Sequence, residues 1–258
     1  MLDHDLKLLL DVAVDAGDIA LKYFQNDPKK WEKDDAQGPV TVADLEINAM
    51  LETRLQAARP DYGWLSEESE DNSSRLACER VFILDPIDGT RAFIQGHENF
   101  AHSFAVAEKG IVTSAVVHMP AKNMTFTASL GGGAKLNGEP IEPSTVTVLQ
   151  DAEVLVAKPM MDAKFWPGGV PPVTQNFRSS LAYRLSLVAN GRFDAMFTFR
   201  PAWEWDVAAG DLICTEAGAA VFDAKGRLPI YNSEGAKIPG MIACGPNLRA
   251  PFLKHLAV

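Results

Sequence analysis

The residues best suited to chemistry lie in the segment 85–90, which reads Asp-Pro-Ile-Asp-Gly-Thr. This segment follows an apolar run over residues 80–84, and α/β folds tend to place their sites at such strand ends. Its two aspartates are three positions apart, and the proline stiffens the link between them. Gly89 lets the backbone approach a ligand closely, and Thr90 is expected to begin a short helix whose free N–H groups favour phosphate. Hard oxygen ligands beside an anion cradle indicate a magnesium site that binds a phosphate ester.

Four further acidic residues lie where predicted strands end or helices begin: Glu67, Glu68, Asp206 and Asp44. Glu67 and Glu68 end a short predicted strand. Asp206 precedes one predicted helix, and Asp44 lies in the first turn of another. Taken alone, each of these positions is explained by a turn, an N-cap, a solvated charge run or a helix dipole. Their joint presence favours the metal-site interpretation.

Hydrophobic periodicity predicts the elements that would hold these residues. Helices are expected over residues 4–25, 41–58, 180–189 and 247–255, with a short helix from Thr90 and another after Asp206. Strands are expected over residues 64–66, 80–84, 102–108, 111–119, 123–130, 153–157, 193–199, 220–222 and 241–243. The polar stretch 29–38 is predicted to be a long surface loop. The pattern indicates two α/β halves, residues 1–145 with most of the acidic candidates and residues 146–258 with Asp206.

The composition is that of a globular protein with an acidic surface. Hydrophobic residues make up 47% of the 258 residues, and 24 basic against 34 acidic residues give a formal net charge of −10. This balance argues against a nucleic-acid or anionic-membrane binder, because both partners are polyanions. It permits a small anionic ligand where a metal ion or backbone N–H groups invert the local field.

Three cysteines, Cys78, Cys214 and Cys244, are too few and too scattered for a disulfide framework or a zinc cage, so reduced thiols are expected. The N-terminus is acidic where a signal peptide would be basic, and no apolar run reaches the roughly 18 residues of a membrane span. The sequence therefore predicts a cytoplasmic protein without a membrane segment.

Other phosphate-handling motifs fail on spacing. Four residues separate Cys244 from Arg249, one fewer than in the loop of a thiol phosphatase. Asp85 and Asp88 are one residue too far apart for the Asp-x-Asp pattern of aspartyl-phosphate enzymes. No Gly-x-x-x-x-Gly-Lys-[Ser/Thr] loop occurs, and glycines 131–133 lie between predicted strands, where a hairpin explains them better.

Four segments together resemble the signature segments of the inositol monophosphatase family, in the family's order and spacing. They are Pro39–Asp44 (PVTVAD), Trp64–Ser69 (WLSEES), Asp85–Thr90 (DPIDGT) and Trp205–Gly210 (WDVAAG). The resemblance implies an α/β (α+β) fold, a layered α/β/α/β/α sandwich of the inositol monophosphatase/fructose-1,6-bisphosphatase type. It also implies a lithium-sensitive phosphomonoesterase with two or three Mg²⁺ ions, commonly a homodimer, that acts on a small phosphorylated substrate.

The resemblance also implies residue roles by position. The metal ligands would be Glu67, Asp85, the carbonyl of Ile87, Asp88 and Asp206. Catalysis is assigned to Glu67, Thr90 and Asp44, with the last two orienting the attacking water. Phosphate would bind to Asp88 and to the N–H groups around Gly89 and Thr90, and Lys33 would lie near the site. Water activated by bound Mg²⁺ would attack the phosphate in line, so no covalent intermediate is needed.

Substrate choice is expected to depend on the second half of the chain. An inositol-specific member of the family typically carries a glutamate about seven residues before the Trp-Asp pair, but residues 198–201 read Thr-Phe-Arg-Pro. Arg200 suits a second phosphate better than a neutral polyol, because guanidinium binds phosphate oxygens in pairs. With Ser179 and Ser180, which the family resemblance suggests, the predicted substrate-binding residues are Ser179, Ser180, Arg184 and Arg200. The alternative is that the two arginines are ordinary surface or helix residues.

Three functions remain open at this point. Ser179-Ser180-Leu181 and the segment 88–93 resemble the 3′(2′),5′-bisphosphate nucleotidase branch, whose members convert adenosine 3′,5′-bisphosphate to AMP. The alternative is an inositol-1-monophosphatase or another sugar or polyol monophosphatase. A more remote alternative is a non-catalytic binding protein on the same fold, although no predicted metal ligand is missing. The histidines, His102 and His118 among them, are expected to be structural, because magnesium prefers oxygen ligands.

Overall fold

The structure is a computed structural model that describes residues 4–33 and 38–256. The helices are α1 (His4–Tyr23), α2 (Val42–Ala58), α3 (Thr90–Ile94), α4 (Leu181–Ala189), α5 (Glu204–Ala217) and α6 (Arg249–Leu256). Short 3₁₀ helices cover Ser73–Ala77, Pro120–Lys122, Leu149–Asp151, Lys158–Met161, Ala163–Phe165 and Pro246–Leu248.

Two larger sheets organise the chain. The first has seven strands in the order β3 (Gly63–Ser66), β4 (Arg80–Asp88), β5 (Ala101–Glu108), β6 (Ile111–Met119), β7 (Met124–Ser129), β8 (Gly133–Leu136) and β9 (Glu139–Pro140). The second has five strands in the order β11 (Thr174–Asn176), β10 (Glu153–Val156), β12 (Ala195–Thr198), β16 (Met241–Cys244) and β14 (Ala220–Phe222). Two strand pairs complete the set, β1 (Lys30–Glu32) with β2 (Pro39–Thr41) and β13 (Ala202–Trp203) with β15 (Lys237–Ile238).

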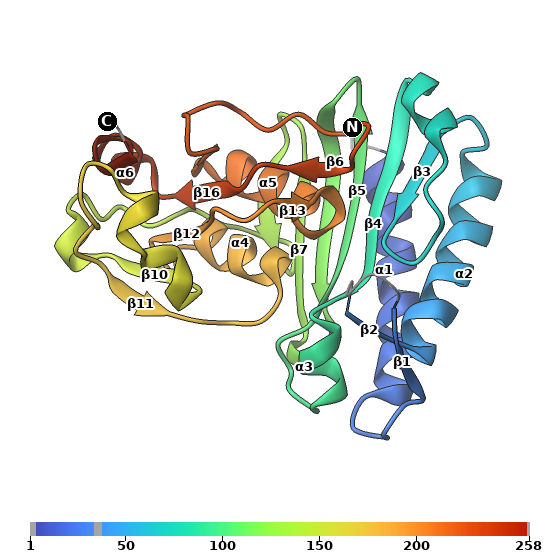
Figure 1. Ribbon diagram of the computed structural model, residues 1–258. Helices are drawn as coiled ribbons and strands as arrows, with labels where there is room; N and C mark the ends of the chain where they lie inside the picture. The colour runs from blue at the N-terminus through green and yellow to red at the C-terminus, as the bar shows by residue number, and fades with distance from the viewer. Residues whose placement is uncertain (1–3, 34–37, 257–258) are drawn as a thin grey trace.

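The elements form five layers, which confirms the predicted α/β/α/β/α sandwich. Figure 1 shows α1 and α2 on one side, then the seven-stranded sheet, α4 with α5, the five-stranded sheet, and α6 at the far end. Successive side chains of β4 point to opposite faces of the sheet, so this one strand contributes to the hydrophobic clusters on both faces. Phe82 and Leu84 pack into the cluster with α1 and α2, whereas Val81 and Ile83 pack into the cluster with α4 and α5. A third cluster, with Trp166, lies between the five-stranded sheet and α6.

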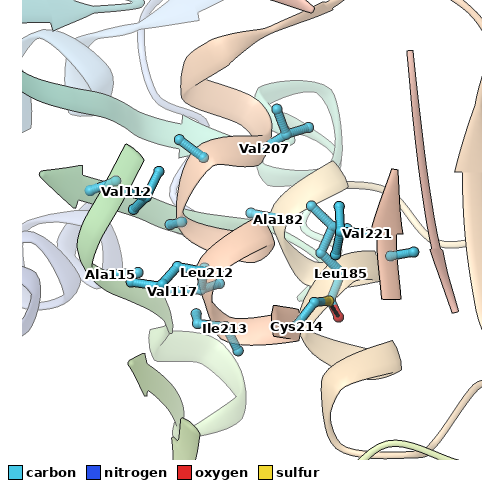
Figure 2. Packing of buried hydrophobic residues seen from close by; sticks show 14 of the residues in the cluster. Val112, Ala115, Val117, Ala182, Leu185, Val207, Leu212, Ile213, Cys214 and Val221 are labelled. Atoms are coloured by element: carbon cyan, nitrogen blue, oxygen red, sulfur yellow. Dashed lines mark hydrogen bonds between the residues drawn. The ribbon is translucent and has the colours of Figure 1, made fainter. Parts of the chain in front are cut away.

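Helices α4 and α5 pack closely in the central layer. A Cβ atom built on Gly210 of α5 would lie 2.5 Å from Cδ1 of Leu185 on α4, so only glycine fits at this crossing. The Cys214 thiol donates to the carbonyl of Leu185 over 3.1 Å. Figure 2 shows Leu212 and Ile213 of α5 beside Ala115 and Val117 of β6, with Leu185 of α4 and Cys214 of α5 on the opposite side of α5. The packing fixes α5, which carries Asp206, against the sheet that carries the other acidic residues.

Several sequence-based boundaries need correction. The stretch 29–38 was predicted to be a loop, but Lys30–Glu32 forms β1 and pairs with β2. Helix α5 begins at Glu204 and not after Asp206, so Asp206 lies within its first turn. Strand β4 continues through residues 85–88 to Asp88. Strands β2, β8, β9, β11, β13 and β15 were missed because each lacks the apolar run that marks the equally short strands at 153–157, 220–222 and 241–243.

The remaining sequence-based expectations concern thiols, membranes and domains. All three cysteines are unpaired, and Cys214 and Cys244 are buried. Within residues 4–33 and 38–256, no helix is both long and apolar enough to cross a lipid bilayer. The division at residues 145/146 stays a prediction. The two larger sheets lie on opposite sides of that division, and one hydrophobic cluster joins residues of both.

Candidate metal centre

Glu67 and Asp85 lie side by side at the ends of two parallel strands. Strands β3 and β4 pair in parallel up to Ser66 and Leu84, and the Glu67 N–H continues the ladder by donating to the Leu84 carbonyl over 3.1 Å. The next residue along each strand is acidic. Parallel pairing therefore brings two carboxylates to the same edge of the sheet, at the position where open α/β sheets bind ligands.

Asp206 joins them from the first turn of α5. The Ser103 hydroxyl of β5 donates to the carbonyl of Trp205 over 2.8 Å and ties this turn to the sheet. Glu67, Asp85 and Asp206 each offer one carboxylate oxygen, and these oxygens all lie within 4.8 Å of one another. Three predicted ligands, 139 positions apart at the extremes (206 − 67), thus converge on one point.

The electrostatics of the cluster favour a cation. Burial, and then the charge of Glu67, raise the pKa of Asp85 well above its usual range. Burial and the charge of Asp88 raise the pKa of Asp206 in the same way. A divalent cation among these oxygens would remove the repulsion and restore the ionised forms. An all-oxygen donor set of this kind suits Mg²⁺.

Lys33 supplies the chain's own partial counter-charge. Its ammonium group donates to Oε1 of Glu67 over 2.8 Å and to Oε1 of Glu68 over 2.7 Å. Burial opposes its charged form, but Glu67 and Glu68 raise the pKa of Lys33 above its ordinary value. Burial, and then the charge of Glu67, raise the pKa of Glu68 to about 7 despite this contact. The structure therefore places Lys33 at the edge of the acidic cluster, where the sequence resemblance located it.

The predicted phosphate cradle lies where β4 runs into α3. Gly89 has φ +98°, and a Cβ atom on it would lie 3.0 Å from the carbonyl oxygen of Asn99, so a larger residue is strained there. The Thr90 hydroxyl lies 3.0 Å from the Ile87 carbonyl and 3.5 Å from Oδ1 of Asp44. Asp44 is fully buried and accepts from the N–H and hydroxyl of Thr41. Burial raises the pKa of Asp44 to about 6.

Asp88 links the segment 85–90, which we call the metal loop, to α4. Its Oδ2 accepts from the Ser180 hydroxyl over 2.6 Å and from the Ala182 N–H over 2.7 Å. Ser180 is the N-cap of α4 and holds a positive φ of +68°, which is unusual for a residue with a side chain. Burial raises the pKa of Asp88 to about 6. Asp88 thus lines the cavity but shares one oxygen with a structural contact.

One buried histidine contacts the metal loop directly. The β4–β5 pairing is interrupted between Asp85 and Asp88, which leaves the Pro86 carbonyl outside the ladder. Nδ1 of His102 lies 2.5 Å from that carbonyl oxygen, and His102 is fully buried. Burial lowers the pKa of His102 to about 3, so the ring is neutral and donates through Nδ1. The imidazole replaces the donor that the bulge removes, a role that sequence reasoning did not identify.

The acidic cluster and the predicted phosphate cradle line a cavity of about 300 Å³. It is lined by Gly38, Pro39, Glu67, Asp85, Asp88, Gly89, Thr90, Arg91, Ala92, Phe177, Ser179 and Asp206. An apolar groove of about 520 Å³ between α1 and β7–β8 is larger, but it lies away from the acidic residues.

The predicted substrate-binding residues are not all brought to this cavity. Ser179 lines it, and Ser180 is engaged with Asp88. Arg184 is buried behind the lining, with Nε donating to the carbonyl of Arg178 over 2.5 Å. Arg200 is exposed and is not among the lining residues. Sequence reasoning missed Phe177, because one phenylalanine in a polar loop carries no spacing signal.

Glu204 is not available to a substrate. Its carboxylate is fully buried and accepts from the N–H of Asn232, the N–H of Ser233 and the hydroxyl of Ser233. Glu204 is the first residue of α5. Its contacts anchor α5 to the loop before β15.

Comparison with known proteins gives a consistent result. The model of the inositol monophosphatase family matches residues 1–248. An inositol-1-monophosphatase of Rhizobium meliloti is 35% identical over 229 residues, which cover 84% of this chain and 82% of that protein. A histidinol-phosphatase of Chlorobaculum parvum is 32% identical over 256 residues, 95% of each chain.

Two further relatives carry a different name. A putative Nus factor SuhB of Neisseria meningitidis is 32% identical over 227 residues, 84% of each chain. Among solved structures, the extragenic suppressor protein suhB of Bartonella henselae superimposes with a TM-score of 0.84 at 26% identity, covering 98% of both chains.

Proposed function

The chain belongs to the inositol monophosphatase family, and we propose that it hydrolyses a small phosphate monoester with Mg²⁺ bound at Glu67, Asp85 and Asp206. Membership makes it a phosphatase of a metal-dependent family, a phosphoric monoester hydrolase. The single observation that carries the metal assignment is the convergence of three carboxylate oxygens within 4.8 Å at the ends of two parallel strands and one helix.

The proposed roles of the other residues are those that the family resemblance implies for these positions. Asp88 and the Ile87 carbonyl complete the ligand set. Bound Mg²⁺ would lower the pKa of a coordinated water and stabilise the charge that develops on the phosphoryl oxygens. The Thr90 hydroxyl lies within hydrogen-bond distance of both Asp44 and the Ile87 carbonyl, and together with Asp44 it would orient the attacking water. The N–H groups around Gly89 and Thr90 bind the phosphate at the start of α3.

Two observations bear on the substrate. The bisphosphate nucleotidase hypothesis relied on Arg200, whose exposed position away from the cavity lining gives it no support. Arg91, the basic residue that follows Thr90, does line the cavity and offers a cation to a second anionic group. Adenosine 3′,5′-bisphosphate therefore remains our first candidate. Inositol 1-phosphate and histidinol phosphate, the esters suggested by the relatives' names, are the alternatives.

The test is phosphate release from these three esters at equal concentration, with Mg²⁺ and with EDTA. We expect release only with Mg²⁺. A kcat/KM ratio of about 100 in favour of the nucleotide, equivalent to about 3 kcal/mol, would establish the nucleotidase. A preference for inositol phosphate would refute that assignment while leaving the phosphatase intact. Release that is undiminished by EDTA would refute the metal mechanism.

Three further properties are proposed from the family resemblance alone. We expect inhibition by Li⁺, two or three Mg²⁺ ions in the active state, and a homodimer. Phosphate release against Li⁺ concentration, calorimetric Mg²⁺ titration and analytical ultracentrifugation test them in turn. The predicted cytoplasmic location stays a prediction from the sequence.

A non-catalytic role on the same fold is the remaining alternative. One relative is named a putative Nus factor, a name that does not mention phosphatase activity. The carboxylates of the cluster, together with Thr90 and Asp44, argue for retained chemistry. Absence of Mg²⁺-dependent turnover over a broad panel of phosphate esters would favour the binding role.

A further inference from the structure

Phe177 is exposed beside a polar cavity, where a phenylalanine gains nothing from the protein core. All 13 phenylalanines lie in the described residues, and Phe177 is the only one classed as exposed, with 55% of its surface accessible. It lines the same cavity as the acidic cluster. Leaving that much apolar surface in water forgoes the stabilisation of burial, so a ligand that covers the ring would recover it.

One contact to the ring and two contacts of the same loop relate Phe177 to the metal centre. The Arg184 guanidinium lies 4.5 Å from the centroid of the Phe177 ring and covers one side of it. Arg184 is itself buried and fixed by its contact with the Arg178 carbonyl. Ser180 then ties the same loop to Asp88 of the metal centre. Phe177 is therefore positioned relative to the phosphate site before any substrate arrives.

We propose that Phe177 is a stacking platform for the leaving group, and that the substrate is a phosphate monoester whose alcohol carries a planar heteroaromatic ring. This inference rests on the proposed function and narrows it to one class of ester. A planar nucleobase or imidazole can stack on the face of a phenylalanine ring whichever hydrogen-bond donors and acceptors it carries, because every such ring has a π-face. A ring of hydroxyl groups gains less from that face and needs polar partners.

The polar partners that a polyol would need are scarce on this side of the cavity. Residues 198–201 contain no carboxylate, and the Glu204 carboxylate is occupied by Asn232 and Ser233. Among the described residues, Ser179 and Thr90 are the hydroxyl-bearing side chains that line the cavity, and Thr90 is already assigned to the attacking water. The cavity lining therefore combines the proposed phosphate-binding residues Gly89 and Thr90 with one exposed aromatic ring, that of Phe177.

The test compares kcat/KM for two ring-bearing esters, adenosine 3′,5′-bisphosphate and histidinol phosphate, with that for inositol 1-phosphate. Wild type is assayed beside Phe177→Leu, Phe177→Tyr and the control Trp31→Leu, which removes a partly exposed aromatic residue outside this cavity. We expect Phe177→Leu to lower the ratio of ring-bearing to polyol activity about 10-fold. Phe177→Tyr should restore the ratio because it keeps the ring, and Trp31→Leu should leave it unchanged.

Two outcomes would overturn the stacking role. A ratio that is the same in Phe177→Leu and wild type would show that the ring does not select the leaving group. A changed sedimentation coefficient in Phe177→Leu, with the ratio unchanged, would assign Phe177 to a contact between two copies of the chain.

Equilibrium binding separates this inference from the proposed function. If wild type releases no phosphate from any of the three esters, the proposed function fails. Calorimetric binding of adenosine 3′,5′-bisphosphate in the presence of Mg²⁺ still tests the platform. Affinity about 10-fold weaker in Phe177→Leu supports it, and equal affinity, or no binding to wild type, contradicts it.

Discussion

At the scale of single residues, the centre concentrates negative charge that the chain balances only in part. Glu67, Asp85 and Asp206 meet within 4.8 Å, and Lys33 neutralises one side of the group. The other polar contacts around the cluster are positional: Ser180 holds Asp88, and His102 holds the Pro86 carbonyl. Substitutions of the proposed ligands and of the residues that contact the metal loop should therefore both change metal binding.

Asp88→Asn tests the ligand set at nearly constant shape. The amide keeps an oxygen that can accept from Ser180, so we expect the melting temperature to stay close to that of wild type. Loss of one charge from the cluster should lower kcat by about 100-fold or more, equivalent to about 3 kcal/mol. The control is Asp211→Asn, a carboxylate of α5 that accepts from the Tyr231 hydroxyl outside the cavity. Full activity in Asp88→Asn, or equal losses in both variants, would contradict the assignment.

His102→Leu tests the support of the metal loop. Removing the donor leaves the buried Pro86 carbonyl unpaired, so the loop should relax and bind metal more weakly. We expect the Mg²⁺ concentration for half-maximal activity to rise about 10-fold, a typical effect of residues that orient metal ligands. His102→Asn, whose side-chain amide can donate from a similar position, should recover most of this loss.

His118→Leu is the matched control for that experiment. His118 stacks on His102 with 5.9 Å between ring centroids, and its Nδ1 contacts Thr125 instead of the metal loop. The His118→Leu variant should have a lower melting temperature than wild type but the same Mg²⁺ concentration for half-maximal activity. An unchanged Mg²⁺ requirement in His102→Leu would show that the histidine only fills space.

At the scale of elements, the site depends on three junctions: β3 with β4, β4 with α3, and α4 with α5. Parallel pairing places Glu67 beside Asp85, and the glycine at φ +98° turns the chain from β4 into α3. The close crossing of α4 and α5 sets Asp206 relative to Ser180 and hence to Asp88. A substitution that separates α4 from α5 should therefore shift Asp206 relative to Asp88, although the substituted residue does not contact the metal centre.

Gly210→Ala is the variant that tests the crossing. The new methyl group would overlap Leu185, and separating the helices should cost about 1–3 kcal/mol of unfolding free energy, beyond the small gain in helix propensity. Chemical denaturation measures this loss. Gly235→Ala is the control, because no atom lies within 4 Å of a Cβ atom built there. Equal stability of the two variants would show that the helices have room to spare.

The sequence predicted long elements well and short ones poorly. The predicted segments 4–25, 41–58 and 111–119 carry enough apolar repeats to define a period, and α1, α2 and β6 follow them to within two residues. Strands β13 and β15 have two residues each and owe their existence to pairing with each other, which no local pattern reveals. The acidic residues were found because they lie in recognisable segments. Phe177 and the role of His102 depend on contacts between distant segments and had no such signal.

At the scale of the whole molecule, stability and metal binding are linked through protons. Burial raises the pKa values of Asp44 and Asp88 from 3.8 to about 6. The metal-free fold thus binds protons more tightly than the unfolded chain, and this contribution to stability is lost as the pH rises through about 6. Mg²⁺ competes with the proton of Asp88, which is a proposed ligand, so the affinity for Mg²⁺ should rise over that interval.

Thermal unfolding with EDTA and with Mg²⁺, at pH 5 and pH 7.5, tests this linkage. At a 100-fold excess over Kd, Mg²⁺ should stabilise the fold by about 2.7 kcal/mol, an increase of several degrees in melting temperature. We expect the increase to be clearly larger at pH 7.5 than at pH 5. An equal or larger increase at pH 5 would mean that the buried carboxylates do not bind the metal.

The central claim is that one Mg²⁺ site, built by Glu67, Asp85 and Asp206, is required for phosphate-ester hydrolysis. Its most direct test is a Mg²⁺ titration of metal-free protein in which calorimetric binding and phosphate release are measured on the same preparation. We expect phosphate release to be absent before Mg²⁺ is added and to rise over the concentrations at which Mg²⁺ binds. Phosphate release at full rate in EDTA, or Mg²⁺ binding that persists unchanged in Asp206→Asn, would contradict it.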